Sequence, residues 1–162
     1  MNNRPEGTSL PIHEKVFAYV TRGNDLLVFR EIGFEHFGLQ VPAGSPNLGE
    51  SLENAVLRET REETGLTMIS LVRYLGSTDA DQTKYGIEAI HRRHFYHLTT
   101  TEETPVTWHH EEKDPSVITD YTPNQIVFEL EWIPLEKKPL ALAEGHGAFL
   151  KSLDESIMKA KK

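Results

Sequence analysis

The sequence contains no cysteine among its 162 residues, and this absence excludes several kinds of chemistry. Disulfide bonds, thiol nucleophiles and cysteine-ligated zinc or iron–sulfur centres are all ruled out. No apolar run approaches the roughly 18 residues of a membrane span. The N-terminal stretch also lacks the apolar region of a signal peptide. We therefore expect a cytoplasmic protein without a membrane partner.

Positive charge is scarce as well, because 17 Lys and Arg stand against 25 Asp and Glu, for a formal net charge of −8. This balance disfavours non-specific binding to nucleic-acid polymers or to anionic membranes. The chain length suits one domain with its own hydrophobic core. We expect that domain to cover residues 14–162, after a flexible tail at residues 1–13.

Hydrophobic patterning predicts strands and helices in alternation. Strands are expected at residues 15–21, 25–31, 68–75, 89–98 and 125–134. Helices are expected at residues 51–64 and 149–157. The first two strands are joined by Arg22-Gly23-Asn24, a hairpin turn, whereas residues 99–124 form a long polar segment without a pattern. This order predicts an α/β fold with a mixed sheet flanked by helices on both sides. Phe37 is expected in the core.

The predicted helix at residues 51–64 carries an unusual group of acids. At about 100° per residue, one of its faces begins with apolar residues and ends with Glu59, Glu62 and Glu63. The apolar part should pack inward, so these carboxylates are aimed at the body of the protein. Their mutual repulsion and partial burial both cost free energy, and a divalent cation would remove both costs. The competing interpretation is a solvated face with ordinary salt bridges. Glu53 projects elsewhere and is expected at the surface.

Residues 44–66, GSPNLGESLENAVLRETREETGL, resemble the Nudix box, whose pattern is G-x5-E-x7-R-E-U-x-E-E-x-G-U, with U a bulky aliphatic residue. The chain fills its fixed positions with Gly44, Glu50, Arg58, Glu59, Glu62, Glu63, Gly65 and Leu66. The departure is Thr60, where an aliphatic residue is usual. Because Thr60 points away from the acids, we expect it to affect packing more than chemistry. The resemblance implies the Nudix α/β/α sandwich.

The resemblance also implies a MutT-like Nudix hydrolase. Such an enzyme uses Mg²⁺ or Mn²⁺ to cleave a pyrophosphate bond in a nucleoside diphosphate linked to another group. Its main metal ligands would be Glu59, Glu62 and Glu63. Glu50 would lie at the edge of the metal cluster, and the Gly44 carbonyl is a possible backbone ligand. Arg58 is expected to orient a carboxylate. The partner implied is a small nucleotide-type substrate, and a homodimer is possible because many relatives are dimers.

Several candidates lie outside the box. Many family members use a further glutamate to bind metal or to act as general base, and Glu111 and Glu112 in the polar segment are candidates, with Glu88 a weaker one. Which residue activates water is left open between these and the box glutamates. Arg92 and Arg93 either contact substrate phosphate or are exposed strand charges. Trp108 either stacks on a base or anchors its segment to the core.

Three other functions are less favoured. A non-catalytic Nudix domain that senses a nucleotide is the main alternative, but such domains often lose box acids that this chain retains. An isoprenyl diphosphate isomerase of this fold would call for a cysteine. RNA decapping is disfavoured by the net charge of −8. A zinc site at His91, His94 and His97 is not expected, since neighbouring members of this set point to opposite faces of a strand.

Overall fold

The computed structural model describes residues 7–112, 125–137 and 140–162. The strands in these ranges are β1 (Ile12–Arg22), β2 (Asp25–Glu31), β3 (Ala43–Gly44), β4 (Ile69–Asp81), β5 (Ile90–Thr100), β6 (Thr107–Glu112) and β7 (Ile126–Pro134). The helices are α1 (Leu52–Thr64) and α2 (Leu150–Ala160), with the short 3₁₀ turns η1 (Glu35–Phe37) and η2 (Thr83–Tyr85).

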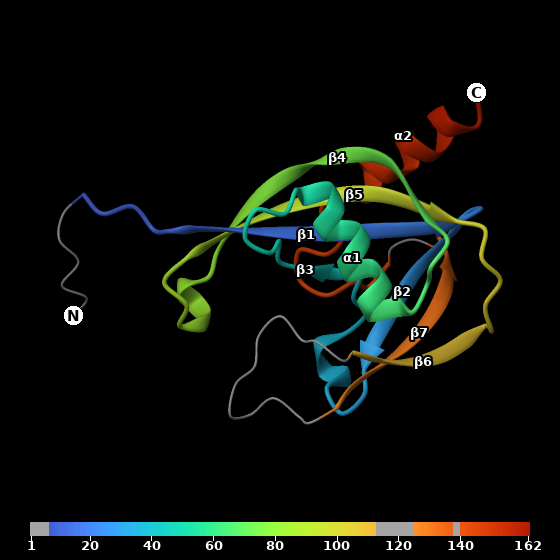
Figure 1. Ribbon diagram of the computed structural model, residues 1–162, viewed down its shortest axis with the longest axis horizontal. Coiled ribbons are helices and arrows are strands. Elements are labelled where there is room, and N and C mark those ends of the chain that lie inside the picture. The colour runs from blue at the N-terminus through green and yellow to red at the C-terminus, as the bar shows by residue number, and fades with distance from the viewer. Residues whose placement is uncertain (1–6, 113–124, 138–139) are drawn as a thin grey trace.

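The strands form one mixed sheet in the order β4-β5-β1-β2-β7-β6, and β3 pairs with β1. The β1–β5 pair is parallel, and the other pairs are antiparallel. One hydrophobic core lies under α1 and a second lies under α2, so the sheet is the middle layer of three (Figure 1). The predicted α/β/α arrangement is confirmed.

Strand β1 lies in the middle of the sheet and is buried on both faces. Val16, Ala18 and Val20 enter the core beside α1, whereas Phe17 and Tyr19 enter the core beside α2. This explains why the strand reads as a continuous apolar run instead of alternating with polar residues. The predicted hairpin follows, since Arg22 pairs with Asp25 across a tight turn.

Helix α1 begins and ends as the sequence predicts. The Ser51 hydroxyl accepts a hydrogen bond from the Asn54 amide at 3.1 Å and caps the N-terminus. Gly65 ends the helix with φ 77°, a left-handed conformation that favours glycine. Thr60 is fully buried, and its hydroxyl donates to the Val56 carbonyl at 2.7 Å. Its role is therefore in packing, as expected from its direction on the helix.

The structure corrects four expectations. Strand β1 begins at Ile12, inside the predicted tail, of which residues 1–6 lie outside the described ranges. Strand β4 runs six residues past the predicted end, because its continuation at residues 76–81 reads GSTDAD and has no apolar period. Strand β6 lies within the predicted polar loop, whose residues 113–124 are outside the described ranges. Phe37 is 54% exposed and is not a core residue.

None of the described helices is long and apolar enough to cross a membrane.

Candidate functional site

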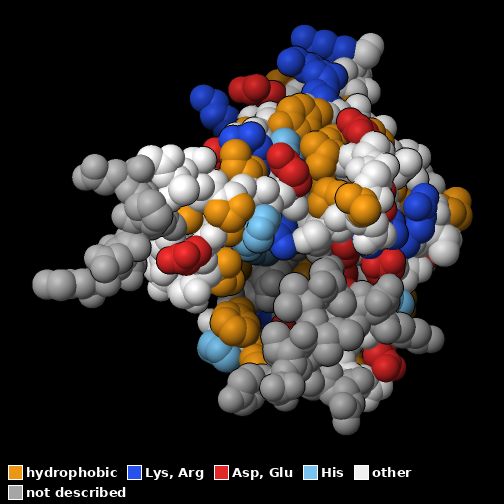
Figure 2. Space-filling view, turned by 60° about the vertical axis from the view of Figure 1, so that its left-hand side comes forward, with side chains coloured by type: hydrophobic (Ala, Val, Ile, Leu, Met, Phe, Trp, Pro, Cys, Tyr) orange, Lys and Arg blue, Asp and Glu red, His pale blue; other side chains and the backbone are white. Residues whose placement is uncertain are grey.

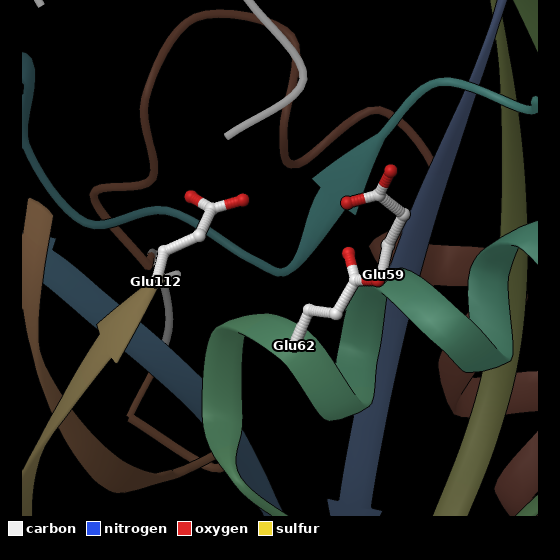
Figure 3. Close-up of side chains that lie close together, drawn as sticks. All are labelled: Glu59, Glu62 and Glu112. Atoms are coloured by element: carbon white, nitrogen blue, oxygen red, sulfur yellow. The ribbon is translucent and has the colours of Figure 1, made fainter. Parts of the chain in front are cut away.

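Three carboxylates from two distant elements meet beside α1. Glu59 and Glu62 come from the helix and Glu112 from the end of β6, and one oxygen of each lies within 4.8 Å of the others. Glu59 and Glu112 are buried, and Glu62 is partly exposed. Figure 3 shows the three side chains converging on the space between the helix and the strand end. Negative charges this close raise one another's energy unless a proton or a cation compensates them.

Strand β6 delivers Glu112 to this position because it packs against α1. The Trp108 indole N–H donates to the Thr64 carbonyl at 3.0 Å, and the His110 Nε2 contacts the Glu62 carbonyl at 2.8 Å. Side chains alternate along a strand, so Glu112 shares the helix-facing side with these two residues and Glu111 lies on the other side. Of the two glutamates proposed from the sequence, the structure therefore brings only Glu112 to the acids. The contacts of Trp108 favour its anchoring role.

Glu63 lies beside this group. Its side chain is buried, and its Oε2 accepts a hydrogen bond from the Ala43 amide at 3.0 Å. Burial, followed by the charge of Glu112, raises the pKa of Glu63 well above its usual value. Glu63 thus links α1 to β3 and borders the group that Glu59, Glu62 and Glu112 form.

Arg58 holds the acids of the box in place. Its guanidinium contacts the Glu50 carboxylate at 2.8 Å, Glu59 at 2.9 Å and Glu62 at 3.1 Å, and it donates to the Ser45 carbonyl at 2.9 Å. Its hydrogen bonds lower the pKa of Glu50. The pKa of Glu59 is raised by burial, and Arg58 opposes that shift. This geometry makes Arg58 a positioning residue. Glu50 lies at the rim of the site and is held there by its ion pair with Arg58.

Gly44 gives the Glu59 carboxylate its space. A Cβ at this position would overlap the carboxylate carbon and both of its oxygens. Strand β3 cannot move away freely, since Gly44 pairs with Val16 and Ala43 pairs with Phe17 of β1. The first glycine of the box is therefore required by a close approach of backbone and side chain.

The two arginines of β5 have different surroundings. Arg92 is paired at the surface with Asp79 through two hydrogen bonds of 2.9 and 3.0 Å. Arg93 lines a cavity and lies over the Phe17 ring at 5.5 Å. The structure thus supports the surface interpretation for Arg92 and leaves Arg93 as the substrate-binding candidate.

Sequence reasoning missed Lys15. Its ammonium group donates to the Ser45 hydroxyl in the box loop at 2.6 Å. Burial lowers its pKa, and the charge of Glu59 opposes that shift. A lysine directly before an apolar run could have pointed to this contact, because a partly buried ammonium group needs a compensating partner.

Comparison with known proteins identifies the family. The family model of the Nudix domain matches residues 11–153. No match to the sequence was found among curated proteins. Among solved structures, a MutT Nudix hydrolase from Burkholderia pseudomallei is 21% identical, with a TM-score of 0.61 over 88% of this chain and 98% of its own.

Two further structures have the same fold. A MutT protein from Methanosarcina mazei Go1 is 20% identical, with a TM-score of 0.58 over 96% of this chain and 100% of its own. A UDP-X diphosphatase is 15% identical, with a TM-score of 0.60 over 98% of this chain and 68% of its own. At these identities the structures support the fold, and the match of the family model assigns the chain. The protein therefore belongs to the Nudix family of hydrolases, enzymes that act on phosphoric anhydride bonds.

Proposed function

We propose that this chain hydrolyses the pyrophosphate bond of a nucleoside diphosphate linked to another moiety, with the help of Mg²⁺ or Mn²⁺. The observation that carries the proposal is that Glu59 and Glu62 of α1 and Glu112 of β6 each place one carboxylate oxygen within 4.8 Å of the others. All three offer hard oxygen ligands, which Mg²⁺ and Mn²⁺ prefer. When bound, a divalent cation neutralises charge on the phosphate oxygens.

The residues around the three carboxylates have separate roles in this proposal. Arg58 fixes Glu59 and Glu62, and Gly44 leaves room for Glu59, so the ligands are held before the cation arrives. A water molecule must lose a proton as it attacks phosphorus. Glu63 lies outside the group of three and beside Glu112, and we assign it the role of accepting that proton. The bond from phosphorus to the bridging oxygen then breaks, and a phosphate-bearing group leaves.

The substrate class is the least constrained part of the proposal. One structure with the same fold is a UDP-X diphosphatase, and we therefore place UDP-linked diphosphates first among the substrates to test. The cytoplasm stays the proposed location. The possible homodimer stays a prediction.

The test is a released-phosphate screen over nucleoside diphosphate derivatives, with Mg²⁺ and Mn²⁺ compared. We expect Glu59→Gln and Glu112→Gln to lose both turnover and the rise in melting temperature that the cation gives the wild-type protein. Glu63→Gln should lose turnover by about 10²-fold or more, as is typical of a missing general base, and should keep the cation-dependent rise.

The matched control is Glu53→Gln, an exposed glutamate of the same helix, which should behave as wild type. Full turnover in Glu59→Gln and Glu112→Gln would show that the site is wrongly assigned. Tight nucleotide binding without turnover by the wild-type protein would indicate a sensing domain instead of an enzyme.

A further inference from the structure

An apolar groove of about 430 Å³ lies beside α2, on the face of the sheet opposite to α1. The wall on α2 carries Asp154, Ile157, Met158 and Lys161, and the opposite wall includes Leu135 and Glu136, which follow β7. Met158 is 67% exposed. A groove with apolar walls and an exposed methionine at its edge favours a surface that another molecule covers.

The outer face of α2 divides its charges by sign along the helix. Asp154 and Glu155 precede Met158, whereas Lys161 and Lys162 follow it. At about 100° per residue and with Met158 at 0°, the two acids lie near −40° and +60°, and the two lysines lie near −60° and +40°. Lys161 keeps helical backbone angles, with φ −84° and ψ −8°. The five side chains therefore share one face, with an acidic half, a methionine at the centre and a basic half.

This outer face is presented to solvent. The C-terminal end of α2 projects from the body of the molecule (Figure 1), and Figure 2 shows Lys and Arg side chains gathered at that end, with Asp and Glu side chains next to them. Glu155, Lys161 and Lys162 are exposed. The Lys161 ammonium group donates a hydrogen bond to the Asn24 side chain at 3.0 Å, which holds it across the groove. The opposite side of the helix, with Leu153, is buried in the core.

Two copies of the outer face of α2 complement each other when the helices lie antiparallel. A twofold axis at Met158 places Asp154 of one copy beside Lys161 of the other, and Glu155 beside Lys162, with each pair about 1.5 Å apart in height along the helix. The symmetry forms each pair twice. It also brings together the two Met158 side chains, whose flexible thioethers fill irregular gaps, and sets the two grooves opposite each other. A parallel arrangement would instead oppose acids to acids and lysines to lysines.

We propose that the protein forms a dimer through this face, with α2 of one copy antiparallel to α2 of a second copy. The charge pattern favours a second copy over a different partner, because a twofold contact requires one surface to complement itself. One short helix and one groove make a small interface, so we expect a dissociation constant in the micromolar range. The carboxylates of the candidate site lie on the other face of the sheet, and the inference therefore does not depend on the proposed function.

The test measures self-association by sedimentation velocity over a range of protein concentrations. Two half-swaps, Asp154→Lys with Glu155→Lys and Lys161→Glu with Lys162→Glu, each replace the ion pairs by repulsions and should raise the dissociation constant about tenfold or more. The full swap, which combines these substitutions, re-forms the pairs with exchanged signs and should return to within about threefold of wild type. Its net charge equals the −8 of the wild type, so a general charge effect cannot explain that recovery.

A second variant tests the centre of the interface. Met158→Glu places two carboxylates at the twofold axis and should also weaken association about tenfold or more. The matched control is Met68→Glu, which changes a methionine that is 61% exposed and precedes β4, and it should associate as wild type does. Far-UV circular dichroism and melting temperatures verify that each variant is folded.

The melting temperature of the wild-type protein should also rise with its concentration, because association stabilises the folded state. A wild-type protein that stays monomeric at millimolar concentration would overturn the proposal. A full swap that associates no better than the half-swaps, or unchanged association of Met158→Glu, would overturn it as well.

Discussion

At the residue scale, the three carboxylates of the candidate site can lie together because their neighbours either make room or supply charge. Gly44 makes room for Glu59. Arg58 supplies one positive charge, which Glu50, Glu59 and Glu62 share. One guanidinium cannot balance all the acids at this place, so negative charge remains for a cation to neutralise.

The space at Gly44 gives a sharp prediction. In Gly44→Ala the new methyl group must displace the Glu59 carboxylate, and a ligand displaced by about 1 Å can cost about 10²-fold in rate. We expect kcat/KM to fall by that order, together with the affinity for Mn²⁺ measured by calorimetry. The control is Gly147→Ala, where a Cβ meets no atom closer than 3.4 Å. Equal activity in the two variants would mean that Glu59 has another position open to it.

The sequence predicts where a site residue points only when a regular spacing of apolar residues sets the orientation of its helix or strand. The directions of Glu59, Glu62 and Arg58 could be predicted because a helix of known period fixes them, and in the structure Arg58 contacts both glutamates. Glu112 could not be separated from Glu111, since neither face of β6 shows an apolar pattern that would set its orientation. Phe37 was predicted in the core because hydrophobicity alone does not distinguish a packed ring from an exposed one.

At the scale of elements, β6 shows why no strand was predicted within the polar segment at residues 99–124. Among the described residues it is an edge strand that pairs with β7 alone, and its sequence, TWHHEE, is polar apart from Trp108. Its inward side chains meet the end of α1 through hydrogen bonds, and Trp108 also packs against the core. The strands and helices with a regular apolar period were predicted, whereas β6 and the second half of β4, residues 76–81, lack that period.

The docking of β6 on α1 can be tested at Trp108. In Trp108→Phe the ring volume is largely kept, but the N–H that reaches the Thr64 carbonyl is lost. We expect unfolding in urea to require about 1 kcal/mol less free energy, with KM for the nucleotide substrate unchanged. A rise in KM with unaltered stability would instead restore the base-stacking role for this residue.

At the scale of the whole molecule, two histidines make the fold sensitive to acid. His97 bridges Thr21 of β1 and Ser156 of α2 through hydrogen bonds of 2.8 Å each. Burial lowers the pKa of His97 to about 4, and burial lowers the pKa of His146 to about 4 as well. Between pH 6.5 and 4 the unfolded chain therefore binds protons that the folded chain does not. The contribution of these two histidines to the free energy of unfolding therefore falls as the pH drops through this range.

The contribution of His97 should be measurable by urea unfolding at pH 7 and pH 5. Its shift predicts a loss of about 2 kcal/mol between these two values. The His97→Gln variant should lack that part of the pH dependence, whatever its stability at pH 7. The control His13→Gln removes an exposed histidine and should keep the wild-type slope. If wild type and His97→Gln have the same slope, His97 is protonated as easily in the folded as in the unfolded protein.

The separation of the acids along the chain has a kinetic consequence. Strands β1 and β2 form a local hairpin and β4 and β5 are neighbours in sequence, whereas Glu112 reaches α1 only after β6 has docked. Contacts between distant segments form late in folding. Repulsion among Glu59, Glu62 and Glu112 then acts mainly on the finished structure, where it speeds unfolding. A divalent cation held there should slow the unfolding rate of the protein and leave its folding rate almost unchanged.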